Sequence, residues 1–253
     1  MNKKCFSSHP IFSIITVTYN AAQTLEPTIQ SVIAQTYHSI EYIIIDGAST
    51  DATLQIVDKY KSHIATFISE PDKGIYDAMN KGLGMAKGDY VCFLNAGDTL
   101  HQSDTLSQMV YSLQTSRLPD VIYGQTNIVD SNRRFLHARR LEAPESLTWK
   151  SFRQGMLVCH QAFFAKRTLA ESYNLQYRFS SDFDWCIRIM KKATTLHNTH
   201  LTLIDYLDEG MTTRNRRASL KERFCIMVKH YGWCSTVAHH IWFVLRLLLK
   251  PGQ

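Results

Sequence analysis

Polar side chains recur at the carboxyl ends of successive predicted strands. They are Tyr19 with Asn20, then Asp46, then Asp72, and finally Asn95 with Asp98. In an open α/β sheet, ligands bind outside the carboxyl ends of the strands, because loops and helix N-termini converge there. An Asp at a strand end can instead simply cap the next helix, and for Asp51 or Asp104 that explanation is equally good. Together, the other residues predict a polar binding rim.

The stretch "LNAGD" at residues 94–98 has the residue types of a cation site. Asn95 and Asp98 offer oxygen ligands on a tight turn, and Ala96 and Gly97 are small enough for a diphosphate to approach. Mg²⁺ and Mn²⁺ prefer oxygen ligands and share their coordination shell with phosphate. Two phosphate-binding loops are excluded, because "TYNAAQ" after the first strand has no glycine and "GLGMAKGD" lacks a Lys followed by Ser or Thr. The sequence therefore favours a metal ion as the group that neutralises phosphate charge.

Alternating strand and helix patterns position these residues. β-branched runs predict strands over 12–20, 40–49, 64–72 and 89–98, and helical spacing predicts helices over 24–37, 50–61 and about 75–86. Short links between them imply a mostly parallel sheet with helices on both faces. Farther along, the pattern predicts a helix (103–114), a strand with a returning hairpin arm (120–130, 133–140), a helix and loop (144–157), a short strand within 158–169, a helix over 180–193 capped by Ser180, and a last strand and polar loop within 201–215.

Composition indicates a packed enzyme or binding domain and excludes disordered and fibrous classes. The 253 residues are 45% hydrophobic and 20% charged, and this length allows one large α/β domain with an appendage. Six scattered cysteines with no two-residue spacing argue against a zinc ribbon or a disulfide framework and suit a reducing compartment. The N-terminal apolar run is short and broken by Ser and Thr, so it predicts a first strand rather than a signal peptide.

Four ordered motifs resemble those of family 2 inverting glycosyltransferases with the GT-A fold. They are "SIITVTYN", "IIIDGASTDAT", "SEPDKGIYDAMNKG" and "GDYVCFLNAGD", and the third is typical of bacterial polysaccharide-assembly members. The resemblance is strong over about residues 11–100 and moderate over 155–190. It implies an α/β GT-A domain over 1–213, with a nucleotide-sugar half at about 11–100 and an acceptor half at 101–213, followed by a helical tail over 214–253.

The resemblance also implies a nucleotide-sugar site at the predicted rim. Its residues are Thr18, Tyr19 and Asn20 lining the pocket, Asp46 receiving the uracil N–H, and Asp72 close to the base and ribose. "NAGD" occupies the place of the DxD-type motif of the family, with Asp98 as the ligand of Mn²⁺ or Mg²⁺ and Asn95 near the ribose or the metal. Asn95 replaces an acid of the family pattern, so fewer protein oxygens would hold the metal.

"FSSDFDW" at 179–185 resembles the family segment that supplies the catalytic base, with Ser181 in place of an acid. We assign Asp182 as general base, since a sugar hydroxyl must lose its proton as it attacks the anomeric carbon. An N-cap role for Asp182, or Asp184 as the base, is the alternative. Acceptor or diphosphate contacts are expected from Asp184, Trp185, and the strand residues His160 and Gln161 of "CHQAFF", with a core histidine as the alternative for His160.

The C-terminal tail carries the positive charge of the chain. Residues 214–253 hold eight Lys or Arg against one acid, Glu222, whereas the whole chain has a net charge of +6. The apolar residues predicted to share one helical stripe are Leu220, Phe224, Met227, Val228 and Tyr231, and "IWFVLRLLLK" (241–250) is too short to span a bilayer. Residues 217–250 thus predict an anchor on the inner face of the cell membrane, or alternatively a helix packed on the domain. No nucleic-acid motif accompanies the charge.

These features predict a cytoplasmic, peripheral membrane enzyme of bacterial surface-polysaccharide synthesis. It would transfer a sugar, UDP-linked by preference, to a lipid-linked saccharide in a single inverting displacement. Two alternatives stay open. A nucleotidyltransferase would normally carry a glycine-rich signature after the first strand, which this chain lacks. A catalytically inactive nucleotide-sugar binding protein is suggested by Asn95 and Ser181, which stand where the family places acids.

Overall fold

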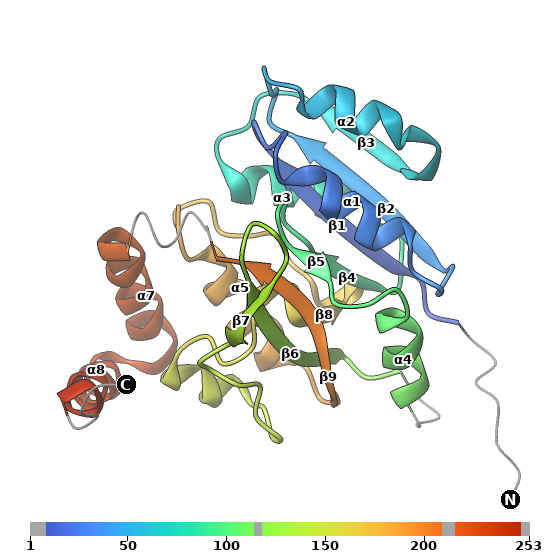
Figure 1. Cartoon of the computed structure of the whole chain (residues 1–253). Coiled ribbons are helices and arrows are strands. Elements are labelled where there is room, and N and C mark those ends of the chain that lie inside the picture. Colours follow the sequence, from blue (N-terminus) through green and yellow to red (C-terminus); the bar gives the residue numbers. More distant parts are fainter. Residues whose placement is uncertain (1–8, 114–117, 209–215, 249–253) are drawn as a thin grey trace, which may run out of the picture.

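The structure is a computed structural model that describes residues 9–113, 118–208 and 216–248. In this part of the chain, nine strands form one sheet in the order β3-β2-β1-β4-β8-β6-β9-β5, with β7 paired to β6 (Figure 1). The strands are β1 (Phe12–Thr18), β2 (Ile40–Asp46), β3 (Thr66–Ser69), β4 (Tyr90–Phe93), β5 (Thr99–Leu100), β6 (Val121–Val129), β7 (Phe135–Ala138), β8 (Phe163–Lys166) and β9 (Leu196–Leu207).

The two halves of the sheet differ in strand direction. Strands β3, β2, β1 and β4 run parallel, as the alternating pattern predicts. Beyond β4, the β6–β9 pair is parallel and the β4–β8, β6–β8, β6–β7 and β5–β9 pairs are antiparallel. The sheet is therefore mixed, and the expected parallel arrangement dominates only in its N-terminal half. The predicted hairpin is present as β6 and β7, whereas the two-residue strand β5 is too short to leave an alternation pattern.

Helices cover both faces of the sheet. They are α1 (Leu25–Ile33), α2 (Thr53–Lys59), α3 (Ile75–Met85), α4 (Thr105–Ser112), α5 (Ser181–Lys192), α7 (Arg216–Tyr231) and α8 (Trp233–Leu248), with 3₁₀ turns η1 (Lys61–His63), η2 (Trp149–Gln154), η3 (His160–Ala162) and η4 (Arg167–Leu169). Because successive strand side chains point to opposite faces, β1 gives Ile15 and Val17 to one core and Phe12 and Ile14 to the other. Helices α3, α5 and α7 cover the first core, and α1, α2 and α4 cover the second.

Helix α7 packs against α5 and shares its core, with Ile226 and Met227 buried. The predicted apolar stripe was wrong at Leu220, which is 52% exposed, and it omitted Ile226. The face that docks on α5 is partly polar, since Ser219 and His230 contact the α5 region from it. An apolar period alone therefore does not mark this face.

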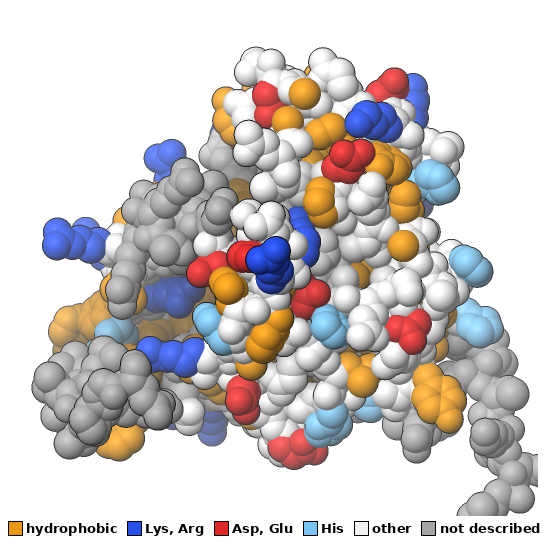
Figure 2. Space-filling view, viewed as in Figure 1, with side chains coloured by type: hydrophobic (Ala, Val, Ile, Leu, Met, Phe, Trp, Pro, Cys, Tyr) orange, Lys and Arg blue, Asp and Glu red, His pale blue; other side chains and the backbone are white. Residues whose placement is uncertain are grey.

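Helix α8 extends from α7 at the side of the molecule away from β1 to β3 (Figure 1). Trp233, Ile241 and Trp242 are more than half exposed on it, and Lys and Arg side chains gather on the same side of the molecule, at the left of Figure 2. Among the described residues, no helix combines the length and the apolar character needed to cross a membrane. Residues 209–215 of the strand and polar loop predicted within 201–215, and residues 249 and 250 of the anchor predicted over 217–250, lie outside the described residues.

Candidate functional site

The ends of β1, β2 and β3 meet at one edge of the sheet and form a strand-end rim, which comprises Thr18, Tyr19, Asn20, Asp46 and Asp72. The strand register places Thr18 opposite Asp46, and Asp46 opposite Ser69 of β3. Gly47 allows close approach here, because a Cβ atom on it would lie 2.4 Å from Asp72 Oδ2 and 3.4 Å from the Tyr19 ring. The side chains of Tyr19 and Asp72 therefore both lie against the Gly47 backbone at this edge of the sheet, as the sequence predicts.

Asp46 supports the rim from inside. Its carboxylate is fully buried and accepts hydrogen bonds from the Ser49 N–H at 2.9 Å and the Ser69 hydroxyl at 2.6 Å. Asn20 adds to this scaffold, because its N–H donates to Ser49 Oγ at 2.8 Å and its Oδ1 accepts from the Thr50 N–H at 2.9 Å. Ser49 and Ser69 were not singled out from the sequence, since their role appears only when the β2 and β3 ends are neighbours. The uracil contact predicted for Asp46 stays a prediction.

The rim also holds an unsatisfied polar atom. Thr18 is 5% exposed, and its Oγ1 is buried without a hydrogen-bond partner among the described residues. Tyr19 next to it is 65% exposed. A buried hydroxyl without a partner costs free energy that a polar ligand can recover. The rim thus offers a ligand one hydroxyl without a hydrogen-bond partner in the described part of the chain and one exposed aromatic ring.

Asp98 lies on a turn that follows β4, with Gly97 at a φ of 111°. The Asp98 carboxylate is 5% exposed and accepts hydrogen bonds from Gln161 Nε2 at 2.7 Å and from the Leu207 N–H at 3.0 Å. Burial raises the pKa of Asp98 to about 7, although both hydrogen bonds and the nearby Arg133 guanidinium favour the anion. Arg133, which the sequence analysis missed, reaches this turn from the β6–β7 hairpin and donates to the Gly97 carbonyl. A desolvated carboxylate of this kind gains from a cation.

Asn95 of the same turn completes the candidate metal ligands. Its Oδ1 is buried and has no hydrogen-bond partner among the described residues. In the same part of the chain, no group of three or more His, Cys, Asp or Glu side chains gathers to hold a metal ion. The donor set is therefore one carboxylate and one amide oxygen, which fits a Mg²⁺ or Mn²⁺ ion that takes its remaining ligands from phosphate and water.

A cavity of about 260 Å³ lies between α3, α5, α7 and the 3₁₀ turn η3. Its lining includes Asp182 from the first turn of α5, Tyr76 from the first turn of α3, and Arg223 from α7. The Tyr76 hydroxyl donates to Asp182 Oδ1 at 3.0 Å, and burial beside this carboxylate raises the pKa of Tyr76 well above its ordinary value. Asp182 therefore faces this cavity with one carboxylate oxygen held by Tyr76.

Ser180 precedes α5 at the N-cap position, but the predicted capping bond is absent. Its hydroxyl instead contacts Ser219 Oγ of α7 at 2.9 Å, because α7 lies against the start of α5.

His160 and Gln161 also line the cavity, on the 3₁₀ turn η3 rather than on the predicted strand, which begins at Phe163. The His160 ring stacks on Phe93 with centroids 5.4 Å apart, and its Nε2 contacts the Tyr173 hydroxyl at 2.6 Å. Burial lowers the pKa of His160, so its ring is neutral near pH 7. His160 is thus a packed core histidine that also borders the cavity, while Gln161 joins the cavity to Asp98.

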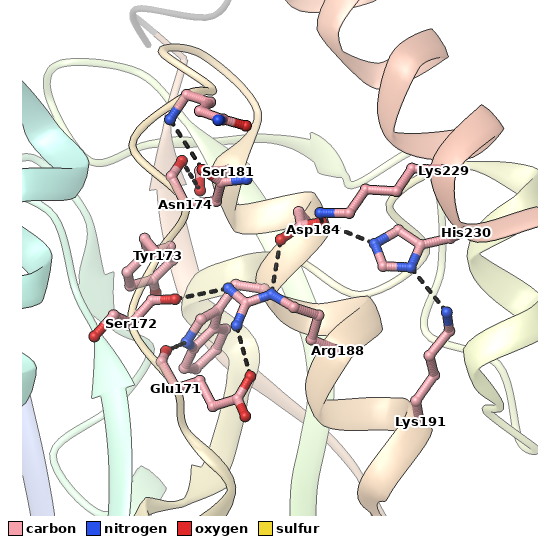
Figure 3. Close-up of polar contacts among 12 residues, drawn as sticks. Glu171, Ser172, Tyr173, Asn174, Ser181, Asp184, Arg188, Lys191, Lys229 and His230 are labelled. Atoms are coloured by element: carbon pink, nitrogen blue, oxygen red, sulfur yellow. Dashed lines mark hydrogen bonds and ion pairs between the residues drawn. The ribbon is translucent and has the colours of Figure 1, made fainter.

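Asp184 and Trp185 do not line the cavity, and the structure gives each a packing role instead of the expected acceptor contact. Asp184 is fully buried and accepts from Arg188 Nε at 2.7 Å and His230 Nε2 at 2.8 Å (Figure 3). Burial alone raises the pKa of Asp184, but these hydrogen bonds outweigh it and lower the pKa to about 2. Trp185 is fully buried and donates from Nε1 to the Glu171 carbonyl at 2.7 Å. The helical period turns position 184 away from position 182, whereas Trp185, three positions after Asp182, is packed in the core against Phe93 and Tyr173.

Comparisons of this chain with known proteins find a matching family model and several relatives. The model for the family described as Glycosyl transferase family 2 matches residues 13–173. A PGL/p-HBAD biosynthesis glycosyltransferase of Mycobacterium tuberculosis is 32% identical over 208 residues, which is 79% of this chain and 78% of that protein. The Escherichia coli protein UDP-Glc:alpha-D-GlcNAc-diphosphoundecaprenol beta-1,3-glucosyltransferase WfaP is 27% identical over 192 residues, covering 76% of this chain and 74% of that one.

Solved structures share the fold. S. aureus TarS 1–349 in complex with UDP-GlcNAc superposes with a TM-score of 0.69 at 17% identity. The superposition covers 86% of this chain and 66% of the TarS chain, so this chain spans just under two thirds of that length. The α/β GT-A fold predicted from the sequence motifs is confirmed, with a mixed central sheet.

Proposed function

Because this chain belongs to glycosyltransferase family 2, we propose that it transfers a sugar from a UDP-sugar to a lipid-linked saccharide, with inversion at the anomeric carbon. The names of its relatives support the choice of substrates. The E. coli relative is named for a UDP-Glc donor and a diphosphoundecaprenol-linked acceptor, and the mycobacterial relative for glycolipid synthesis. The proposed pathway is accordingly the synthesis of a surface polysaccharide or glycolipid.

The observation that carries the proposal is the position of Asp182 in the cavity. Tyr76 occupies one lone pair of Oδ1, which orients the carboxylate and leaves Oδ2 to accept the proton of the attacking acceptor hydroxyl. The donor would lie between this carboxylate and the strand-end rim, where Thr18, Tyr19, Asn20, Asp46 and Asp72 are the proposed nucleotide contacts. Gln161 connects the cavity to the turn that carries the candidate metal ligands, since it lines the cavity and donates to Asp98.

Asp98 and Asn95 are the proposed ligands of Mn²⁺ or Mg²⁺. When bound, the metal supplies Lewis-acid stabilisation of the diphosphate leaving group. The buried, partner-free Asn95 Oδ1 and the desolvated Asp98 carboxylate are the observations that fit such an ion. The alternative of a catalytically inactive binding protein differs from this proposal only in turnover, so an activity measurement separates them.

The test is the substitution Asp182→Asn, assayed with UDP-sugars and an undecaprenyl-diphosphate-linked saccharide. General-base catalysis contributes about 10²–10⁴-fold, so we expect a loss of that size in kcat, while the Kd for UDP stays within twofold. NMR of the product should show a β-linkage from an α-linked donor. Asp58→Asn on the exposed face of α2 is the matched control and should keep full activity. Activity within a few-fold of wild type in Asp182→Asn would rule out this role.

We also propose that the enzyme is cytoplasmic and peripheral on the inner face of the cell membrane, where a lipid-linked acceptor is found. The support is the exposed Trp233, Ile241 and Trp242 of α8 beside basic residues of α7, a combination typical of interfacial helices. We expect the double substitution Trp233→Ser and Trp242→Ser to reduce co-sedimentation with vesicles containing anionic lipid by about tenfold. Unchanged sedimentation would contradict membrane association through α8.

A further inference from the structure

Arg223 of α7 reaches the same cavity as Asp182, although the two residues are far apart in the sequence. Its Nε atom is buried and has no hydrogen-bond partner among the described residues. Arg223 also forms no ion pair with any of these residues. Its guanidinium centre lies 6.0 Å from the Phe183 ring, which gives it an aromatic neighbour but no acceptor. The Arg223 side chain as a whole is partly buried, but a buried N–H of a charged group without a partner is costly, so such an atom at a cavity wall indicates a ligand that supplies the partner.

Arg223 is held in this position by contacts on both sides of it along α7. On one side, Glu222 accepts from the N–H groups of Arg178 and Phe179, both at 2.8 Å, in the loop that leads into α5. On the other side, His230 bonds to Asp184 on α5 (Figure 3). Glu222 is the sole acid of residues 214–253, and its carboxylate oxygens are taken up by this docking. The helix therefore presents the Arg223 guanidinium to the cavity in a preorganised position.

The other arginine of the cavity lining, Arg139, is already committed to the backbone. Its Nη1 donates to the Leu141 carbonyl at 2.8 Å, and its Nη2 donates to the Met156 carbonyl at 2.5 Å. Asp182 has Tyr76 as its partner, and no ion pair joins Asp182 to Arg223 within the described ranges. Among the described charged residues of the lining, Arg223 is thus the cation left without a protein partner.

We propose that Arg223 binds the diphosphate group of a substrate of this enzyme and so makes α7 part of the substrate site. The inference rests on the proposed function and assigns one residue within it. A guanidinium presents a planar fork of N–H donors that matches two phosphate oxygens. The diphosphate belongs either to the nucleotide sugar or to the lipid-linked acceptor, and both are anions that the positive cavity lining would attract. Arg223 lies beyond residues 13–173, the segment that the family model matches.

The experiment is calorimetric titration of the full chain and Arg223→Gln with UDP, with uridine, and with geranyl diphosphate as a soluble prenyl diphosphate. A hydrogen bond to a charged group is worth about 1.5–3 kcal/mol, so we expect the Kd of the bound diphosphate to rise at least about tenfold. The Kd for uridine, which has no phosphate, should stay unchanged. A loss of affinity for UDP identifies the donor diphosphate as the ligand of Arg223, and a loss of affinity for geranyl diphosphate alone identifies the acceptor diphosphate.

Two further arginines serve as matched controls. Arg217→Gln removes the same charge from the exposed surface of α7. Arg153→Gln removes a partly buried arginine whose Nε is also buried without a hydrogen-bond partner among the described residues, but which lies 5.2 Å from the Tyr231 ring, outside the cavity. Both should bind the probes within twofold of wild type, and Arg223→Lys, which keeps the charge but loses the fork, should fall between wild type and Arg223→Gln. Thermal unfolding of each variant checks folding.

Two outcomes would overturn the inference, and they are distinguishable. If the wild type binds UDP, and Arg223→Gln binds both diphosphates with the same Kd as the wild type, then the role assigned to Arg223 is wrong and the proposed function stands. If the wild type binds neither diphosphate, the proposed function fails together with the inference.

Discussion

The polar atoms of the candidate ligand site and those of the α5–α7 interface are equally buried, but they differ in whether they have partners. At the ligand site, Thr18 Oγ1 and Asn95 Oδ1 have no hydrogen-bond partner among the described residues. At the interface, the Asp184 carboxylate is fully buried and is satisfied by Arg188 and His230. Unsatisfied buried atoms leave free energy for a ligand to recover, whereas a satisfied network only holds elements together. Thr18 and Asn95 therefore differ from Asp184 in the missing partner rather than in burial, although a missing partner alone does not mark a site, since, among the described residues, Arg153 Nε is also buried without one outside the cavity.

Asp182 and Asp184 differ in their surroundings within one helical turn. Asp182 faces the cavity and has Tyr76 as its hydrogen-bond partner, while Asp184 faces α7 and contacts Arg188, Lys229 and His230. Removing the first should mainly change catalysis, and removing the second should mainly change stability.

The largest effect on stability is expected from Asp184→Asn. The substitution leaves Arg188 and His230 without their anion inside the α5–α7 interface, and removing one partner of a buried pair typically costs about 3–5 kcal/mol. Lys229 adds little, because its side chain is half exposed. Urea unfolding should show the loss, whereas Asp182→Asn should change the unfolding free energy by less than about 1 kcal/mol. Equal stabilities of the two variants would break the distinction between the two carboxylates.

The distinction also explains what could be predicted from the sequence. The strand-end rim is made by consecutive βα units, so Tyr19, Asp46 and Asp72 stand at fixed places after apolar runs, and periodicity with motif spacing is enough to find them. Asp182 was predicted as the catalytic base through a motif on α5, and the structure places it in the cavity lining, while its role stays a prediction. Because one helix or strand carries each of these features, local pattern was sufficient.

The rest of the site depends on contacts between distant segments, which no local pattern encodes. Tyr76 meets Asp182 across 106 positions, and Gln161 meets Asp98 across 63. Arg223 and Glu222 belong to a helix that the sequence predicted as part of a membrane anchor, with packing on the domain as the alternative, because the docking face of α7 mixes polar and apolar side chains. The same reason explains the error at Leu220. The turn η3 was missed because its three residues lie directly before strand β8 and were predicted to belong to that strand.

A smaller effect is expected from the pH dependence of stability, and it tests whether Asp98 is held for a ligand. The pKa of Asp98 is about 7 in the folded protein because of burial, against an ordinary value of 3.8. The folded state therefore holds a proton that the unfolded chain releases near pH 4, so this group favours folding at low pH and loses that contribution as pH rises through about 7. By linkage, the unfolding free energy of the wild type should fall by roughly 2–3 kcal/mol between pH 5 and pH 8, relative to that of Asp98→Asn.

The measurement is urea unfolding of wild type and Asp98→Asn at pH 5, 6, 7 and 8, with titrations of UDP and Mn²⁺ at the same pH values. Asp98→Asn should remove the part of the pH dependence that is due to this carboxylate. Because only the ionised carboxylate ligates a cation, the Mn²⁺-dependent gain in UDP affinity should increase as pH rises through about 7 and should be absent in Asp98→Asn. Parallel pH profiles of the unfolding free energy for the two proteins would show that Asp98 is ionised in the folded state. Asp98 would then resemble Asp184, whose carboxylate is satisfied by its partners, rather than Asn95, whose Oδ1 has none among the described residues. The contrast between open and satisfied polar atoms would in that case rest on Thr18 and Asn95 alone.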